Sequence, residues 1–277
     1  MLMDMKKYIS PGGWFSFNYP AMWSEFEEEE GSFLFYNPEK WSGNFRISAY
    51  KDRSLSYAKE SIEYDLANNP NAVLKTVGPW KCSYCNETFI EGTEAYTSHF
   101  WITGEGNVSV ECSFTTRKGQ PVAEAEQIIS SLDIRSGKKR YPKEMIPVRI
   151  LEINEINMAY EWVSGQIKKW LKKDFTASLQ DIGHMQELVD SGKLNVHKDE
   201  PWQALGMAFG VMLVNEMDGM DWKTVVDGMQ EYPALRFRDT DLVICPLSIF
   251  SDKVRKGIRC DVMEEFEKIK TEVEKRL

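Results

Sequence analysis

Two cysteines three positions apart, Cys82 and Cys85, form the short motif in this chain whose chemistry is best known. Thiols at this spacing bind zinc, or form a redox pair when a helix N-terminus lowers the pKa of one thiol. A structural zinc site needs four ligands, and only Cys112 and His99 are candidates to complete it. No helix is predicted to begin at Cys85. We therefore expect two ordinary thiols at a strand turn and no bound cofactor, with zinc binding and redox activity as the alternatives.

The spacing of the other reactive side chains matches no known catalytic motif. His99, His184 and His197 each stand alone, and the sequence has neither a G-x-S-x-G nucleophile motif nor a glycine-rich phosphate-binding loop. The 43 acidic residues can form carboxylate pairs in space, but no spacing marks one pair as catalytic. We name no catalytic residue, and enzymatic activity stays open.

A group of polar and aromatic residues in the second half of the chain is the most site-like cluster. Its members fall around short predicted strands and turns, where exposed groups tend to serve binding. They are Trp222, Asp227, Tyr232, Arg236 and Asp241. The guanidinium of Arg236 suits carboxylate recognition, but the simpler interpretation, which we favour, is an internal ion pair with Asp227 or Asp241 that holds the small sheet together.

Trp41 is the corresponding candidate in the first half. It lies in a Pro-Glu-Lys-Trp-Ser-Gly turn, where its ring can be exposed and can serve as a contact anchor for a partner.

The elements that must position these residues follow from hydrophobic periodicity. In the first half, residues alternate with period two, as in half-buried strands, and we expect one mostly antiparallel sheet with two covering helices. The alternating strands are expected at about 15–19, 44–50, 72–77, 80–90, 95–103 and 108–116, and the helices at 54–68 and 121–132. A four-residue hairpin loop, 104–107, is expected to join the last two strands.

In the second half the period changes to that of helices. Amphipathic helices are expected at 153–170 and 179–190, and a helix from Pro201 to Val214 is apolar almost all round, which predicts a buried central helix. Gly206 and Gly210 on that helix leave a groove for another element. Three short strands, a helix from Pro246 and a charged terminal helix from Val262 complete a helical domain with a small antiparallel sheet.

Length and composition predict a two-domain α+β protein. A chain of 277 residues is comfortable for two cores. The polar composition shift places a linker at 136–147, between a sheet domain at 1–135 and a helix-rich α+β domain at 148–277.

Charge and cysteine usage indicate the compartment and exclude one class of partner. The net charge of −9 argues against nucleic acid, although Lys138, Lys139 and Arg140 could form a local basic patch. The N-terminus carries no secretory signal, and no apolar run approaches the ~20 residues that span a bilayer. Five scattered cysteines suit a reducing compartment, so we expect a cytoplasmic protein without membrane association.

The run Gly13-Trp14-Phe15-Ser16-Phe17-Asn18-Tyr19-Pro20, with Trp23, resembles the start of PsbP-like domains. These domains are α/β/α sandwiches, and the resemblance covers roughly residues 8–135. Residues of about 145–277 resemble an uncharacterised bacterial domain family, through Leu205 to Gly210, Pro233 to Arg236 and Pro246 to Val254. The PsbP-like resemblance implies binding more than catalysis. Its lipoprotein members carry a cysteine near the N-terminus, whereas the first cysteine here is Cys82.

Together these observations predict a non-catalytic protein-binding module of adaptor or immunity type. The alternative is a hydrolase or transferase that uses carboxylates in a cleft between the domains. Partner identity, oligomeric state and domain orientation do not follow from the sequence.

Overall fold

A computed structural model describes residues 4–27, 31–136, 141–228 and 230–277. The chain divides into two compact units, Met1–Ile146 with Asp227–Met229, and Pro147–Val226 with Gln230–Leu277. The expected two-domain α+β architecture is therefore confirmed. The basic run at 138–140 lies outside the described residues. Within the described ranges, no helix has both the length and the apolar character needed to cross a membrane.

The first unit is built around strands whose alternating side chains form one aromatic core. Its elements are β1 (Met5–Ile9), η1 (Pro11–Gly13), β2 (Phe15–Pro20), β3 (Ser24–Glu27), β4 (Ser32–Tyr36), β5 (Asn44–Lys51), α1 (Tyr57–Asn68), β6 (Val73–Val77), β7 (Trp80–Glu91), β8 (Glu94–Glu105), β9 (Val108–Arg117), α2 (Ala123–Ser130) and β10 (Asp133–Ile134).

These strands form two sheets, so the expectation of one sheet was wrong. A seven-stranded antiparallel sheet has the order β3-β4-β5-β9-β8-β7-β6, and a separate three-stranded sheet has the order β1-β2-β10. The reason is that β2 packs across the core from the large sheet. The ring of Phe17 meets those of Phe35 and Phe45 edge-on, at centroid distances of 5.2 Å and 6.1 Å. Period-two alternation says which face of a strand is buried but not which sheet the strand joins.

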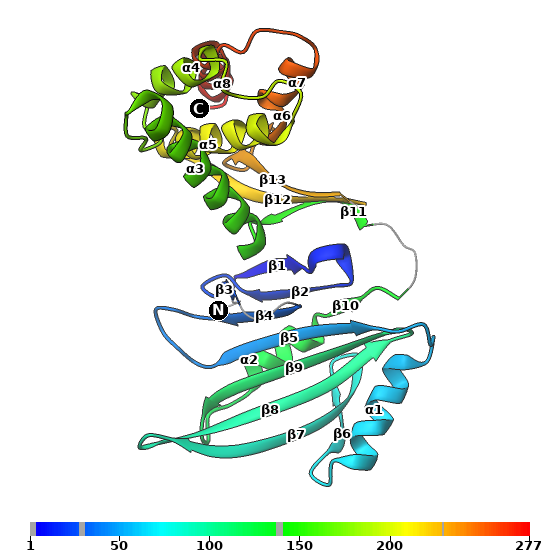
Figure 1. Cartoon of the computed structure of the whole chain (residues 1–277). Coiled ribbons are helices and arrows are strands. Elements are labelled where there is room, and N and C mark those ends of the chain that lie inside the picture. Colours follow the sequence, from blue (N-terminus) through cyan, green and yellow to red (C-terminus); the bar gives the residue numbers. More distant parts are fainter. Residues whose placement is uncertain (1–3, 28–30, 137–140, 229) are drawn as a thin grey trace. The chain divides into compact units, whose positions relative to one another are not determined.

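The large sheet has an inner and an outer face. Trp101 and Cys112 are paired in the register and point to the inner face, which forms the core with the small sheet and α2. Ser83, Ile102 and Glu111 are also paired and point to the outer face. Helix α1 contacts β7, β8 and β9 at one end of this outer face, and Figure 1 shows the β7–β8 hairpin extending away from α1 and β6.

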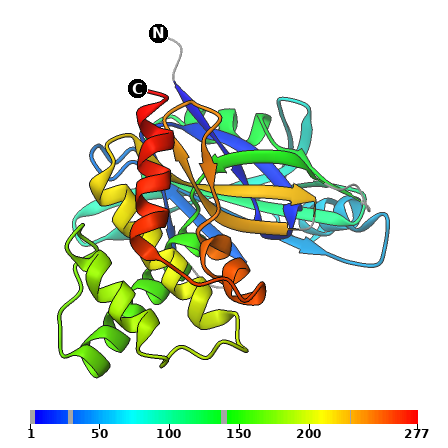
Figure 2. The same ribbon diagram turned by 90° about the horizontal axis from the view of Figure 1, so that it is seen from above.

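The second unit gathers its helices on one side of a small sheet (Figures 1 and 2). The sheet has the order β11-β12-β13-β14. The elements are β11 (Tyr141–Pro147), α3 (Ile150–Leu171), α4 (Asp181–Asp190), α5 (Glu200–Glu216), β12 (Met220–Gly228), β13 (Gln230–Phe237), β14 (Val243–Ile244), α6 (Pro246–Ile249), α7 (Ser251–Arg255) and α8 (Val262–Glu274). Strand β11 occupies much of the stretch where the sequence predicts a linker.

Helix α5 is the buried central helix that the sequence predicts, with Leu205, Phe209 and Leu213 fully buried. Its two glycines explain how other elements approach it. A Cβ at Gly206 would lie 2.0 Å from the carbonyl oxygen of Pro246, and one at Gly210 would lie 2.7 Å from the ring of Trp222. The groove expected from the glycine spacing is filled by these two neighbours.

Candidate partner-binding surface

The loop between β4 and β5 presents Trp41 on a fixed backbone. The buried side chain of Asn37 accepts hydrogen bonds through Oδ1 from the backbone N–H groups of Glu39 (2.9 Å) and Lys40 (3.1 Å). The indole Nε1 of Trp41 donates to Oδ1 of Asn44 at 2.7 Å. These local bonds hold the turn, and the Trp41 ring remains 38% exposed.

The next two residues hold this loop against the sheet and α2. Ser42 donates to Oε2 of Glu124 at 2.7 Å, and its carbonyl oxygen accepts from Oγ1 of Thr116 at 2.7 Å. Gly43 lies against the ring of Phe114, where a Cβ would come within 2.2 Å of a ring carbon. The close approach explains why a glycine stands at this position.

Trp41 belongs to a row of three rings, Trp41, Tyr96 and Phe89, which we call the aromatic row. Phe89 and Tyr96 are directly paired across β7 and β8, and their ring centroids lie 5.8 Å apart in a stacked arrangement. Trp41 meets Tyr96 edge-on at 6.1 Å. Phe89 is 40% exposed, so the row presents apolar area to solvent in a fixed geometry.

A cavity of about 550 Å³ lies beside the aromatic row. Trp41 forms part of its wall, Lys40 and Arg117 add positive charge, and Glu124 sits where α2 begins. The cavity and the row together form a concave, partly apolar surface with a small number of charged groups, which is the usual character of a recognition site.

A second, smaller cavity of about 220 Å³ lies under α1 and contains two carboxyl groups. Ser83 donates to Oδ2 of Asp65 at 2.5 Å, and Asn69 donates to the other oxygen. Partial burial raises the pKa of Glu111, and the nearby Asp65 raises it further. Two carboxyl groups that line one cavity, with the pKa of one of them raised, form an arrangement capable of acid–base chemistry. The predicted cleft between the domains remains untested.

The two cysteines of the C-x-x-C motif cannot act together. Both lie within β7, three positions apart, so their side chains point to opposite faces of the sheet. Cys82 is buried in the core, where burial raises the pKa of its thiol to about 11. Cys85 instead lines the cavity under α1. The expectation of a strand turn was wrong, because β7 continues through both residues. Among the described residues, no group of three or more His, Cys, Asp or Glu side chains could hold a metal ion.

The five candidates from the second half of the chain do not form one cluster, and Asp227 belongs to the first unit. Trp222 packs on α5 at Gly210, and Tyr232 is half-buried on β13. Asp241 accepts from Nε of Arg276 at 2.9 Å. The role of the five in binding stays a prediction.

The interpretation that the sequence favoured, an ion pair of Arg236 with Asp227 or Asp241, was wrong. Arg236 donates to the carbonyl oxygen of Thr240 at 3.0 Å and lies 3.8 Å from Asp239, while Asp227 lies 3.9 Å from Lys143. Its guanidinium thus closes the turn that follows β13.

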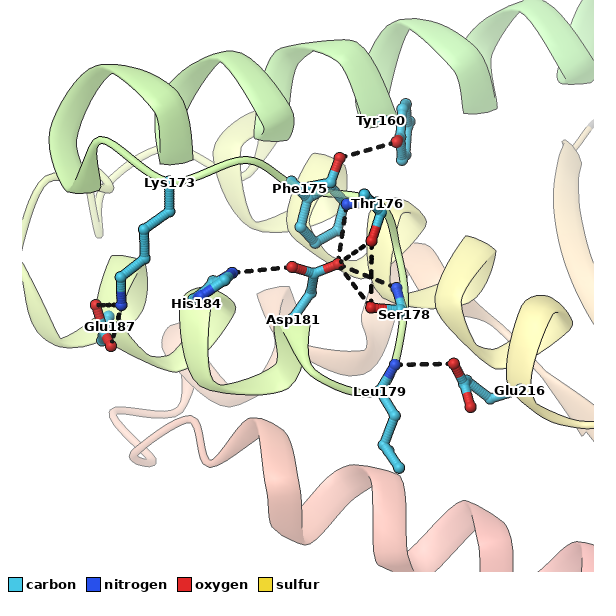
Figure 3. A network of polar contacts seen from close by, with 10 residues as sticks. All are labelled: Tyr160, Lys173, Phe175, Thr176, Ser178, Leu179, Asp181, His184, Glu187 and Glu216. Atoms are coloured by element: carbon cyan, nitrogen blue, oxygen red, sulfur yellow. Dashed lines mark hydrogen bonds and ion pairs between the residues drawn. The ribbon is translucent and has the colours of Figure 1, made fainter.

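A dense polar network surrounds Asp181 at the start of α4 (Figure 3). Its Oδ2 accepts from the backbone N–H and hydroxyl groups of Thr176 and Ser178, at 2.9–3.2 Å. Its Oδ1 is 2.9 Å from Nδ1 of His184. Burial raises the pKa of Asp181, but these hydrogen bonds outweigh burial and leave the pKa below its ordinary value. The carboxylate therefore fixes both the preceding loop and the histidine ring.

A second buried charge cluster fixes the start of α3. Arg149 is 1% exposed and makes a two-pronged ion pair with Glu152, and its Nη2 also lies 2.7 Å from Glu231. Thr224 of β12 donates to Glu152 at 2.8 Å. Each of these polar groups has a hydrogen-bond or ion-pair partner within the cluster. We infer that the cluster joins α3 to the small sheet of the second unit.

Sequence reasoning found Trp41 but missed Phe89, Tyr96 and Arg117. The signal for Phe89 and Tyr96 was present, because a two-residue turn at Gly92-Thr93 places them opposite each other in a hairpin. Their contact with Trp41 required the loop geometry and could not be predicted from the sequence.

Comparisons with known proteins identify relatives without a described activity. Residues 3–157 match a domain of unknown function, DUF3805, and residues 181–266 match a second one, DUF3806. The crystal structure of a protein from Bacteroides thetaiotaomicron VPI-5482, at 1.50 Å resolution, is 47% identical, covers 96% of this chain and 98% of that chain, and has a TM-score of 0.92.

A structure of LpqN, described as involved in cell envelope biogenesis of Mycobacterium tuberculosis, is 11% identical over 49% of this chain and 93% of that chain. Its TM-score of 0.30 supports no conclusion. A search of the curated proteins finds no match.

Proposed function

The chain belongs to the DUF3805 family of domains of unknown function, and from that premise we propose that it is a non-catalytic module that binds another protein through the aromatic row. The observation that supports this most directly is the geometry of Trp41, Tyr96 and Phe89, three rings in contact on the outer face beside a cavity of about 550 Å³. We place this activity in the cytoplasm, in keeping with the scattered free thiols.

The composition of the surface supports a protein partner over a small molecule. Aromatic residues and arginine are enriched in the centres of protein interfaces, where they supply much of the binding energy. Trp41, Tyr96, Phe89 and Arg117 are of these types and adjoin one another. The rings are already held by contacts and hydrogen bonds, so binding would cost little side-chain entropy.

The resemblance of the first unit to PsbP-like domains supports the same proposal, because that resemblance implies binding. The layered first unit, with a large sheet between α1 on one face and α2 with the small sheet on the other, is compatible with it.

The proposal is tested by isolating partners from native cells with the tagged full chain. We expect a stoichiometric partner with the wild type, and a loss of at least tenfold in its affinity with a Trp41→Ala/Phe89→Ala variant, about 1.4 kcal/mol or more. Trp162 is 37% exposed in the second unit and provides the matched control, Trp162→Ala, which should retain the partner.

Equal recovery with the double variant would contradict the role of the aromatic row. Turnover of a substrate that is abolished by Glu111→Gln, with binding unchanged, would instead support acid–base chemistry in the cavity under α1.

A further inference from the structure

The outer part of β7 is a strand edge without a neighbour. Strand β8 pairs with β7 from Ser83 to Glu91, whereas β6 pairs with it only from Trp80 to Tyr84. Within the described part of the chain, residues 85–91 therefore have a strand on one side only. Backbone N–H and C=O groups of an antiparallel strand point alternately to its two sides, so Asn86, Thr88 and Ile90 direct these groups to solvent along this edge.

This edge lacks most of the devices that block strand addition. Natural edges are protected by proline, lysine, bulges or a cover. Residues 85–91 contain no proline or lysine, and their register with β8 runs without a bulge to Glu91 opposite Glu94. Residues 86–91 are all exposed, Ile90 by 75%. Thr88, Phe89 and Ile90 are also of types that favour strands.

The charges on the hairpin are of one sign. Glu87, Glu91 and Glu94 carry negative charge, and the sequence has no lysine or arginine between Lys81 and Arg117. Two copies of the chain joined along this edge would bring glutamates close to glutamates, which is unfavourable. An added strand that carries lysine or arginine would be favoured by the same charges.

The alternation of side chains specifies the pattern of the added strand further. Glu87, Phe89 and Glu91 point to the outer face, on the side of the aromatic row, since β7 alternates without interruption. On this face, a strand added beside β7 would have an acidic side chain, an aromatic ring and a second acidic side chain next to every second residue of its own. Its matching side chains are therefore basic, apolar and basic. This pattern reads the same in both directions and suits parallel or antiparallel addition.

We propose that residues 85–91 of β7 bind an extended segment of the partner, with the pattern basic-x-apolar-x-basic, as an additional strand of the sheet. This inference rests on the proposed protein-binding function and names the chemistry of the partner. Backbone hydrogen bonds supply the affinity, and the alternate side chains supply the specificity.

The test uses the full chain and a capped synthetic peptide, Thr-Lys-Thr-Val-Thr-Lys-Thr. Amide hydrogen exchange is followed residue by residue while the peptide is added. We expect exchange at Asn86, Thr88 and Ile90 to slow by about tenfold or more, because their outward N–H groups gain partners. A peptide with glutamate in place of both lysines should give no protection, and neither should the lysine peptide N-methylated at valine and at the two threonines that flank it.

A charge-reversed variant, Glu87→Lys/Glu91→Lys, gives a test that does not depend on loss of folding. It should bind the glutamate peptide and lose the lysine peptide. Unchanged exchange at residues 85–91 on addition of the lysine peptide would overturn the proposal. So would equal affinity of the wild type and the charge-reversed variant for that peptide, or equal affinity of the wild type for the N-methylated and unmethylated peptides. Protection that appears with increasing protein concentration alone would overturn it too, because a second copy would then be the occupant.

The outcome is separable from that of the proposed function. If Trp41→Ala/Phe89→Ala loses the native partner while Glu87→Lys/Glu91→Lys retains it and the peptide gives no protection, the partner binds the aromatic row without adding a strand. If both variants retain the partner, the proposed function fails as well.

Discussion

Asp181, the first residue of α4, accepts hydrogen bonds from Thr176 and Ser178 in the loop that precedes the helix. Removal of its charge therefore measures how strongly the conformation of this loop depends on the carboxylate. Asp181→Asn keeps the shape of the side chain but weakens the bonds from Thr176 and Ser178. We expect the free energy of unfolding to fall by about 2–3 kcal/mol, because hydrogen bonds to a charged group are worth more than neutral ones. Urea denaturation at neutral pH measures it. Asp190→Asn, at the exposed end of the same helix, should change stability by less than about 0.5 kcal/mol.

The same carboxylate makes a prediction about pH. The pKa of Asp181 in the folded protein lies below its ordinary value, so its contribution to stability is complete above the ordinary value of about 3.9 and is lost as pH falls through the lower folded value. The difference in unfolding free energy between wild type and Asp181→Asn should therefore be constant near neutral pH and shrink below about pH 4. Denaturation curves over a series of pH values measure this, and a constant difference down to the acid limit of folding would contradict it.

Among the helices, α5 depends on Gly206 for its closest contact. A Cβ at this position would lie 2.0 Å from the backbone oxygen of Pro246, which is not a flexible group. We expect Gly206→Ala to destabilise the protein by about 3 kcal/mol, the upper part of the range for overpacked cores. Gly165 in α3 has nothing within 4 Å, so Gly165→Ala should stabilise by about 0.5–1 kcal/mol through helix propensity. Thermal unfolding of both variants separates packing from propensity, and equal shifts would contradict the steric explanation.

The elements themselves could be predicted well where periodicity is strong. The expected strand at 108–116 is β9 (Val108–Arg117), and the expected helix from Pro201 is α5. The loop after β8 was predicted too long: Glu105 pairs with Val108, so only Gly106 and Asn107 form the turn. Glycine content marks a turn but does not give its length.

Features that depend on contacts between distant segments could not be predicted. The division into two sheets and the row formed by Trp41 with Tyr96 both join residues far apart in the chain. The Asp181 network is local, but it depends on the conformation of the loop at 176–178. The apolar face expected for the first helix was also misread, since Leu55 lies before α1 and is 82% exposed. A single sequence gives the burial pattern of each element, and the partner of each element comes from the fold.

On the scale of the whole molecule, each unit has its own hydrophobic core. One core contains Phe45 and Phe114 from the large sheet with rings from the small sheet, and the other contains Phe209 of α5 with side chains from the neighbouring helices and β13. The two sets of buried residues have no member in common among the described residues. Separate cores are the physical basis on which two domains can respond separately to a substitution.

We therefore predict that loss of one core leaves the other unit protected. Phe114→Ala and Phe209→Ala each remove a fully buried ring, at a cost of about 3–5 kcal/mol, in the first and second unit respectively. Hydrogen exchange measured by mass spectrometry should speed up within 4–136 for Phe114→Ala and within 150–277 for Phe209→Ala, because opening of one core exposes only the amides that it covers. Faster exchange in both ranges with either variant would mean that the two cores unfold as one cooperative unit. In that case the binding surface on the first unit would depend on the integrity of the second, and partner affinity would fall with Phe209→Ala as it does with Trp41→Ala/Phe89→Ala.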